Sequence, residues 1–430
     1  TKVRKILQNA IFDFGELYKL YGMVIRNIHD TLIMHRILYP ELPKDLGTLT
    51  SMYTDQPYYK DDLKIAYNIS DYAMRYRYNA LDSAVTIEIA NCLLAELEQK
   101  GMTHQYERQL YLIEPFLIPT KIGMKVDEDH IKTLGDKLEV EHLEKVVEFQ
   151  TLANQNINPS SGPQLKKFFK EVLKVELPKK RTMKGGENKE SETLDKQTLF
   201  QFTTKEKTAA YANIIIDMRA KKKALDYYRV NTVDGRLTAK MNPAGTETGR
   251  PSSGKDDYGE GGNILNLTDD YKKVIKPDDG FFFVEADYKQ AEALCVAVIA
   301  PEPTMLAAFR SGVDLHKKTA SLIFQKLIEQ VTKKERQVGK TANHSLNYQL
   351  GPISFARRNR LPLTFASYVH KRYFQVYPGL TQFHEWIKYE VHKNGTLTNI
   401  MGSKRWFLGR PGDELTREGC AYIPQSTVAD

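Results

Sequence analysis

One helical stripe of unusual composition constrains this chain more than any other feature of its sequence. Four side chains recur at every fourth position, as Arg336, Lys340, His344 and Tyr348. Each step of four residues turns an α-helix by about 400°, so the four side chains lie along one slowly drifting face. Thr332 and Glu335 have the spacing of a capping box, and Gly351-Pro352 is a stop signal, which together predict a helix over residues 333–351.

This stripe matches neither a core face nor an ordinary solvated face. A core face would carry Leu or Val, and a solvated face would mix acids with bases. Two cations, an imidazole and a phenol in line are suited to gripping a polyphosphate at one end and stacking on a base at the other. The pattern therefore predicts a helix that binds a ligand.

Composition limits the class of protein. The 430 residues are enough for about three domains of roughly 150 residues each. Lys and Arg number 62 against 54 Asp and Glu, so the net charge is +8, and a hydrophobic content of 41% excludes wholesale disorder. No apolar run approaches the length of about 18 residues that a membrane helix needs. Cys92, Cys295 and Cys420 lie far apart without a CxxC, which excludes a disulfide framework or zinc ribbon and favours a reducing, cytoplasmic setting.

Basic residues gather in clusters. Residues 166–190 hold nine Lys and Arg against four acids, inside a segment, 156–195, whose Gly, Pro and Asn content is typical of loops. Lys221–Lys223 and Arg357–Arg360 are further clusters. Such clusters can neutralise nucleic-acid phosphates. Taken singly, each is equally compatible with a solvated helix face.

A strand followed by a carboxylate is the second candidate site. The apolar run at 281–286 predicts a buried strand, and Asp287 follows it directly. The carboxyl end of a strand is where α/β sheets present reactive groups. Gln290 and Glu292 come next, and His316 follows further along the chain.

Six segments within residues 233–430 resemble motifs of the family A DNA polymerases, the DNA polymerase I-like enzymes, and occur in the family's order. They are Thr248–Ser253 (the TGR segment), Asn263–Asn266, Asp287–Glu292 (motif A), Gly312–Ala320, Arg336–Tyr348 (motif B, the fingers helix) and Pro424–Asp430 (the segment before motif C).

The start of the chain resembles a second family. Asn9-x3-Asp13 is similar to the second motif of DnaQ-like 3′–5′ exonucleases, and Tyr78-x3-Asp82 to the third. Four residues apart on a helix, the Tyr78 phenol and the Asp82 carboxylate would share one face. The resemblance implies that Asp13 and Asp82 bind a metal pair and that Tyr78 positions the attacking water.

The polymerase resemblance implies roles at a nucleotide site. Asp287 would be a shared ligand of two Mg²⁺ ions, which stabilise the attacking and leaving oxygens of nucleotidyl transfer. The triphosphate of a dNTP would be held by three side chains, Lys340, Arg336 and His316. Tyr348 would stack near the templating base, and Glu292 would block a 2′-hydroxyl.

The same resemblance implies contacts with primer–template DNA. In the minor groove, acceptors common to all base pairs suit an enzyme that reads no sequence. The residues expected there are Arg250, Asn266, Gln290, Arg417 and Gln425. The basic stretch 166–190 would belong to a thumb that closes on duplex phosphates.

Four positions depart from the family pattern, which suggests a divergent, phage-type branch. His344 stands where the family usually has Phe or Tyr, and Gln349 replaces a Gly. Leu294 replaces an Arg, and Ala421 an Asn. The imidazole of His344 leaves sugar selection at that position open.

The expected fold is an α/β multidomain chain, with part of a ribonuclease H-like exonuclease domain followed by a right-hand polymerase domain that lacks its C-terminal palm segment. We expect the exonuclease part at 1–105 and the polymerase at 106–430. Within the latter, the expected ranges are about 128–230 for the thumb, about 231–300 and 396–430 for the palm, and about 301–395 for the fingers. Exonuclease motif I and polymerase motif C would fall outside 1–430. We therefore expect little activity from these residues alone, unless a second polypeptide supplies the missing palm segment.

Two other classes of protein remain open. A single-subunit RNA polymerase also carries Lys and Tyr on its fingers helix, although Glu292 and the exonuclease motifs argue against it. A non-catalytic, DNA-binding remnant is the second alternative, and the presence of Asp287, Lys340 and Tyr348 argues against such decay.

Overall fold

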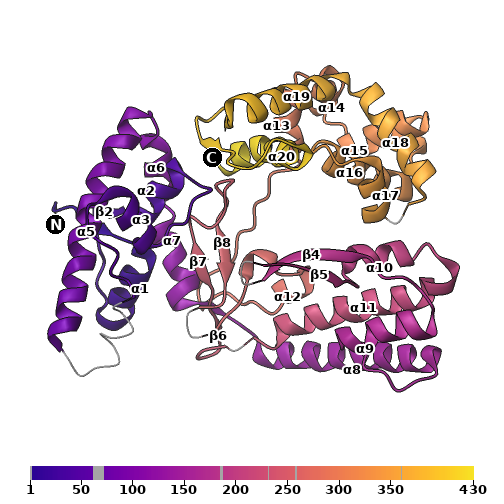
Figure 1. The fold of residues 1–430 in the computed structure, drawn as a ribbon, viewed down its shortest axis with the longest axis horizontal. Coiled ribbons are helices and arrows are strands. Elements are labelled where there is room, and N and C mark those ends of the chain that lie inside the picture. Colours follow the sequence, from indigo (N-terminus) through magenta and orange to yellow (C-terminus); the bar gives the residue numbers. More distant parts are fainter. Residues whose placement is uncertain (1, 62–71, 185–186, 231, 257–258, 360) are drawn as a thin grey trace.

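The computed structural model describes residues 2–61, 72–184, 187–230, 232–256, 259–359 and 361–430. Figure 1 shows an N-terminal unit, a central region of short strands, a unit built on long helices and a C-terminal helical unit. Among the described residues, no helix combines the length and apolar character required to span a bilayer.

The N-terminal unit packs helices around a short parallel strand pair. Strand β1 (Lys5–Leu7) lies parallel to β2 (Ile28–Asp30), with Lys5 opposite Ile28. Among its described residues, the helices of this unit are α1 (Ala10–Tyr21), α2 (Thr31–Leu38), α3 (Leu46–Tyr53), α5 (Tyr72–Gln99) and α6 (Thr103–Leu110).

A single buried carboxylate organises the start of this unit. Asp30 caps α2 by accepting from the Leu32 amide at 2.9 Å, and it also accepts from the amides of Asn9 at 3.0 Å and Ala10 at 2.7 Å. Because these amides are unsatisfied donors at the starts of α1 and α2, one side chain joins both helix starts to the end of β2.

The central region joins this unit to the rest of the chain. Its elements are α7 (Ile113–Leu117), a π-helical turn (Ile118–Ile122), β3 (Met124–Lys125), β6 (Arg236–Leu237), β7 (Lys240–Asn242), β8 (Ser252–Gly254), a 3₁₀ turn (Ile264–Asn266) and α12 (Asp269–Lys272). Strand β3 pairs with β6, and β7 with β8, both antiparallel. Ala239, Met241 and Ala244 belong to the same hydrophobic core as α1, α2 and α5. The N-terminal unit and the central strands therefore share one packed interior.

Two long helices dominate the third unit. Helix α8 (Glu128–Ala153) packs along α11 (Glu206–Tyr228), and Asp127 caps α8 by accepting from the His130 amide at 3.0 Å. The expectation of a loop over 156–195 was wrong. This stretch contains α9 (Gly162–Lys167), a π-helical turn (Phe168–Val172) and the hairpin β4 (Lys179–Lys184)–β5 (Glu187–Glu192), followed by α10 (Lys196–Phe202). Buried Phe168 and Phe169 anchor it beneath the long helices, a tertiary contact that Gly and Pro content does not reveal.

The C-terminal unit is almost entirely helical around an aromatic-rich core. Its elements are α13 (Ala291–Ile299), α14 (Pro303–Arg310), α15 (Leu315–Phe324), a 3₁₀ turn (Ile328–Gln330), α16 (Lys333–Leu346), α17 (Pro352–Asn359), α18 (Leu363–Val376), α19 (Pro378–Tyr389), a π-helical turn (Glu390–Asn394), β9 (Thr396–Thr398), β10 (Lys404–Trp406) and α20 (Asp413–Ala429). Tyr373 and Tyr377 are fully buried at its centre.

The predicted helix 333–351 is shorter in the structure. The capping box of Thr332 and Glu335 is confirmed, but α16 ends at Leu346. Gln349 adopts a left-handed φ of 56°, which an α-helix cannot continue through, and Pro352 begins the next helix. Tyr348 consequently lies just beyond the regular stripe.

The predicted strand at 281–286 is absent, and the side chains are exposed instead of buried. Phe282 and Val284 are 81% and 80% exposed on an extended connection that leads to α13 (Figure 1). The described residues place no strand beside this connection, so its backbone finds no ladder partner and its apolar side chains no opposing layer. A strand prediction from apolar content fails wherever that partner is lacking.

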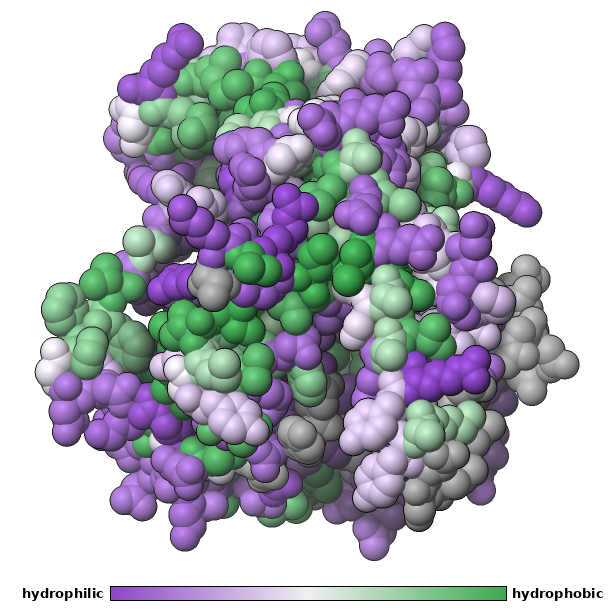
Figure 2. All heavy atoms as spheres, turned by 90° about the vertical axis from the view of Figure 1, so that its left-hand side faces the viewer, coloured by the Kyte–Doolittle hydropathy of each residue, from purple (hydrophilic) through white to green (hydrophobic). Residues whose placement is uncertain are grey.

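The surface of the N-terminal unit is mixed in character. Figure 2 shows hydrophobic residues (green) at the surface among hydrophilic ones (purple) on this side of the molecule. Leu20 and Tyr21, at the end of α1, are 64% and 70% exposed.

Candidate active site

Helices α15 and α16 approach unusually closely, and a glycine permits it. A Cβ built on Gly339 would lie 2.2 Å from the His316 carbonyl oxygen and 2.9 Å from the Ala320 amide nitrogen. Real Cβ atoms do not tolerate such contacts, so only glycine allows this spacing. The close approach places His316 on α15 directly beside the stripe of α16.

The two cations of the stripe have different surroundings. Arg336 donates from Nε at 3.0 Å and from Nη2 at 2.6 Å to Asp314 Oδ2. Asp314 also caps α15 through the Lys317 amide at 3.0 Å. Lys340 is exposed and forms no ion pair with the described residues. Lys340 is therefore the cation most available to an anionic ligand, whereas Arg336 is already oriented by a carboxylate.

His316 is buried and neutral near pH 7. It is 5% exposed, its Nδ1 lies 2.9 Å from Asn343 Nδ2, and its ring lies 5.4 Å from that of His344. Burial, followed by the charge of His344, lowers the pKa of His316 to about 4. The neutral His316 ring can form a hydrogen bond with a ligand but adds no positive charge to the site.

Residues from three separate segments meet at the Glu292 carboxylate, and a fourth segment reaches it only through Tyr348. The Tyr348 hydroxyl donates to Glu292 at the start of α13, and the Arg250 guanidinium, from the loop before β8, donates to the same group. Burial and the hydrogen bond to Glu292 raise the pKa of Tyr348 well above its usual range. A hydrogen bond with Gln425 of α20 opposes this rise. The structure thus brings together Arg250, Glu292, Tyr348 and Gln425, all of which the sequence singled out.

Other predicted residues lie away from this junction. Asp287 is exposed on the extended connection, and Gln290 directly precedes α13 with a left-handed φ of 57°. Asn266 is exposed at the end of a 3₁₀ turn, and Arg417 is half-buried on α20. Within the described parts of the chain, no hydrogen bond or ion pair joins their side chains to Glu292, and their roles stay predictions.

The predicted metal ligands do not form a complete metal site. Among the described residues, no group of three or more His, Cys, Asp or Glu side chains is arranged to hold an ion. Asp287 is a single exposed carboxylate. Asp287 alone supplies too few ligands for two ions, so the described residues would hold only part of such a site.

At the exonuclease-like motif, a lysine occupies the shared face. Lys60 Nζ lies 2.9 Å from the Tyr78 hydroxyl and 2.6 Å from Asp82 Oδ1, which also accepts from the Tyr59 hydroxyl at 2.6 Å. The predicted juxtaposition of Tyr78 and Asp82 holds, and Lys60 neutralises the carboxylate. Asp13 lies on α1, where burial raises the pKa of its carboxyl.

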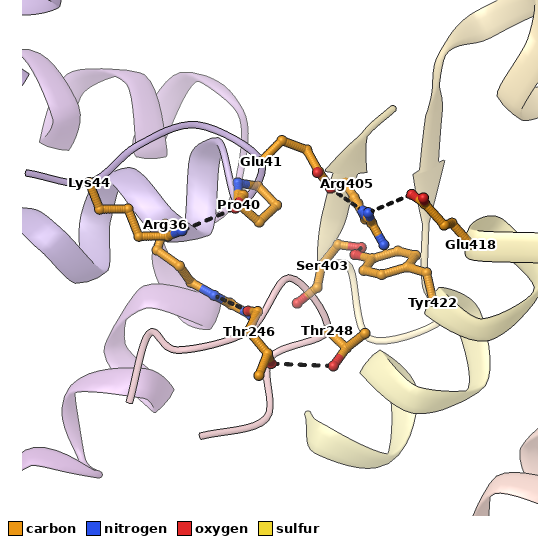
Figure 3. Close-up of polar contacts among 10 residues, drawn as sticks. All are labelled: Arg36, Pro40, Glu41, Lys44, Thr246, Thr248, Ser403, Arg405, Glu418 and Tyr422. Atoms are coloured by element: carbon orange, nitrogen blue, oxygen red, sulfur yellow. Dashed lines mark hydrogen bonds and ion pairs between the residues drawn. The ribbon is translucent and has the colours of Figure 1, made fainter. Parts of the chain in front are cut away.

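Sequence reasoning missed several residues that hold these parts together. Figure 3 shows Arg36, Glu41 and Arg405 between the N-terminal unit, the loop before β8 and the C-terminal unit. Lys60 was also missed. No local pattern marks any of them, because their partners lie far away in the sequence.

Comparison with known proteins identifies both halves of the chain. A family model described as DNA polymerase family A matches residues 128–420, and one described as 3′-5′ exonuclease matches residues 1–98. DNA polymerase I of a Synechocystis species is 29% identical over 94% of this chain and 41% of its own length. That of Aquifex aeolicus is 25% identical over 98% of this chain and 74% of its own length. The chain therefore spans less than half of the Synechocystis relative.

A solved structure supports the fold. The polymerase domain of Pol1 from M. smegmatis, in complex with DNA primer-template and dNTP, superposes with a TM-score of 0.79 at 19% identity, over 99% of this chain and 74% of that one. The expected fold class, an exonuclease part followed by a right-hand polymerase, is confirmed. With 293 of its 430 residues matched by the polymerase family model, this chain belongs to DNA polymerase family A.

Proposed function

We propose that the protein containing this chain extends a DNA primer on a template by transferring nucleotides from dNTPs. The observation that carries the proposal is the junction of Arg250 and Tyr348 on Glu292. Three segments that resemble polymerase motifs supply these residues, and nothing local to any one segment requires them to meet. Family membership indicates the class of reaction, and this junction supports the position of the active site within the chain.

The nucleotide binds along α16. Lys340, exposed and without an ion pair among the described residues, contacts the triphosphate. Arg336, which Asp314 orients, lies one turn nearer the helix start, where backbone amides also favour anions. Neutral His316 offers a hydrogen bond beside them. Preorganised cations of this kind stabilise charge that develops in a phosphoryl transition state.

Glu292 selects the sugar. Two donors hold its carboxylate, so its side chain cannot rotate away from an incoming nucleotide. A fixed side chain excludes an added 2′-hydroxyl better than a mobile one. Tyr348, immobilised through the same carboxylate, provides the aromatic surface for the base pair under formation.

DNA lies between the long-helix unit and the central strands. The long-helix unit, about 128–230, is the thumb, about 301–395 the fingers, and about 231–300 with 396–430 the palm. Arg250, Asn266, Gln290, Arg417 and Gln425 contact the minor groove. The M. smegmatis polymerase domain was solved with DNA primer-template and dNTP bound, which favours the same partners here.

The proposed reaction also requires divalent cations. Mg²⁺ is the expected ion because the assigned ligands are carboxylate oxygens. Asp287 is assigned as one carboxylate ligand in the polymerase, and Asp13 and Asp82 as ligands in a proofreading exonuclease in which Tyr78 positions water. Lys60 pairs with Oδ1 of Asp82, so an ion held by this carboxylate would share it with the lysine.

Single-nucleotide insertion tests the function. The protein that contains this chain is mixed with Mg²⁺, a labelled primer–template and one nucleotide at a time. We expect insertion of only the dNTP complementary to the template base. Untemplated addition, or no insertion at all, would contradict the proposal. Preferred insertion of ribonucleotides would favour an RNA polymerase instead.

A further inference from the structure

An arginine of the exonuclease-like unit holds the loop that carries Arg250. Arg36 lies on α2, far from the polymerase motifs in sequence, and is 5% exposed. Its Nε and Nη2 donate to the Thr246 carbonyl oxygen at 3.1 and 2.8 Å (Figure 3). Two donors on one acceptor fix the loop in direction as well as in distance.

The contact continues through the loop to the active site. The Thr246 hydroxyl donates to the Arg250 carbonyl oxygen at 2.7 Å and lies 3.3 Å from the Thr248 hydroxyl. Arg250 in turn donates to Glu292, which accepts from Tyr348. A path of three hydrogen bonds therefore leads from Arg36 on α2, through Thr246 and Arg250, to the Glu292 carboxylate.

Packing leaves this loop little freedom. Gly249 has a left-handed φ of 86°, and a Cβ there would lie 3.4 Å from both Arg36 Nη2 and Ala429 Cβ. The loop is thus enclosed between α2 and α20. Arg36 also lies near the charged groups of Asp430 and Glu247, which partly offset the cost of burying its guanidinium. Truncating Arg36 would leave the partly buried Thr246 carbonyl without these donors.

A second set of contacts keeps α2 in place. Arg405 of β10, with its side chain only 9% exposed, pairs with Glu41 just after α2 and with Glu418 of α20 at 3.1 Å (Figure 3). Gln105 Nε2 donates to the Met401 carbonyl oxygen at 2.9 Å. These contacts, together with the shared core, make α2 a rigid support for Arg36.

We propose that Arg36 is a positioning residue of the polymerase site: through the Thr246 carbonyl it fixes loop 246–250, and thereby the hold of Arg250 on Glu292. The exonuclease-like unit is then a structural part of the polymerase site as well as a separate catalytic unit. The kinetic consequences rest on the proposed function, whereas the ordering of the loop does not.

The test compares Arg36→Met, Arg36→Lys and Thr246→Val with a control, Arg26→Met. Arg26 belongs to the same unit but forms an exposed ion pair with Glu114, with side chains 65% and 63% exposed. Arg36→Met removes both donors. Arg36→Lys keeps the positive charge but replaces the two guanidinium donors by a single ammonium group. Thr246→Val keeps the Arg36 contact with the Thr246 carbonyl and removes the hydroxyl that bonds to the Arg250 carbonyl and to Thr248.

Hydrogen–deuterium exchange of the full protein tests the ordering independently of chemistry. In Arg36→Met we expect amides of residues 246–250 to exchange about tenfold faster or more, with α8 and α11 unchanged. Arg36→Lys should lie between Met and wild type, and Arg26→Met should match wild type. Unchanged protection of the loop in Arg36→Met would overturn the inference. Faster exchange throughout the protein would also overturn it, because Arg36 would then be merely structural.

Insertion kinetics test the consequence. We expect Arg36→Met and Thr246→Val to lower kcat/KM for the correct dNTP by about tenfold, and Thr246→Val to do so without a change in Tm. In combination with Arg250→Met, neither should lower it further, since the path already ends at Arg250. Effects that multiply in the double variants would overturn the inference. If the wild-type protein inserts no nucleotide, the proposed function fails, and the exchange result alone decides the role of Arg36.

Discussion

Tyr348 and Glu292, 56 residues apart in the sequence, are joined by a hydrogen bond from the phenol to the carboxylate. Tyr348 follows the helix of the basic stripe, and Glu292 lies in the first turn of α13. Arg250 donates to the same carboxylate from a third segment. The bond therefore links the helix proposed to bind triphosphate to the group proposed to select the sugar.

Removing the Glu292 carboxylate should relax sugar selection. In Glu292→Ala we expect the ratio of kcat/KM for dNTP to that for rNTP to fall by roughly tenfold to a hundredfold, because the fixed side chain no longer meets the 2′-hydroxyl. Single-nucleotide insertion with both sugars measures this ratio. Glu285→Ala is the matched control, since Glu285 lies on the exposed connection and pairs with Lys272. An unchanged ratio in Glu292→Ala would remove Glu292 from the sugar-selecting role.

Removing the Lys340 charge should weaken transition-state stabilisation. We expect Lys340→Met to lower kcat/KM for dNTP by roughly a hundredfold or more, as the loss of one preorganised cation does elsewhere. Lys334→Met is the control, because Lys334 is an exposed lysine of the same helix about 120° around its axis from Lys340. If both substitutions lowered kcat/KM equally, the effect would come from net charge alone, which would contradict the specific role of Lys340.

Burial of neutral His316 should make the protein sensitive to acid. The pKa is about 4 in the folded state, below the ordinary histidine value of 6.5, so the folded state binds fewer protons between these values. Stability should then fall as the pH drops from about 6.5 towards 4 and be unaffected by this group above that range. In His316→Gln we expect this loss to shrink by about 2 kcal/mol. Urea unfolding at several pH values measures it, with His104→Gln on α6 as the control. A pH dependence identical to that of wild type would contradict the assignment.

The close approach of α15 and α16 should make Gly339 intolerant of a methyl group. In Gly339→Ala the new Cβ would lie 2.2 Å from the His316 carbonyl oxygen, so the helices must separate. We expect a loss of about 1–3 kcal/mol in the free energy of unfolding. Gly135→Ala on α8 should gain about 0.5–1 kcal/mol, because that Cβ meets only Tyr228 Cβ at 3.5 Å. Similar effects of the two substitutions on urea unfolding would contradict the packing described.

Local patterns in the sequence predicted local structure well. The capping box of Thr332 and Glu335 forms as expected because it depends on residues within one turn. The end of α16 was misplaced because the left-handed conformation of Gln349 has no strong sequence signature.

Features that depend on distant partners were predicted less well. The apolar run at 281–286 indicated a strand, but a strand exists only beside another one. Resemblance to family motifs singled out Arg250, Glu292 and Tyr348, whereas Arg36 went unnoticed because its acceptor lies 210 residues away. Chemistry concentrated in short motifs can be predicted from sequence, and the supports that orient it cannot.

The most direct test of the central account is Asp287→Asn in the protein that contains this chain. Primer extension with dNTPs and Mg²⁺ is measured beside the affinity for labelled primer–template. We predict that extension falls by at least about a thousandfold, as loss of a shared metal ligand requires, while duplex affinity changes less than about threefold. Extension that survives this substitution would contradict the assignment of Asp287 to a metal-dependent nucleotidyl transfer.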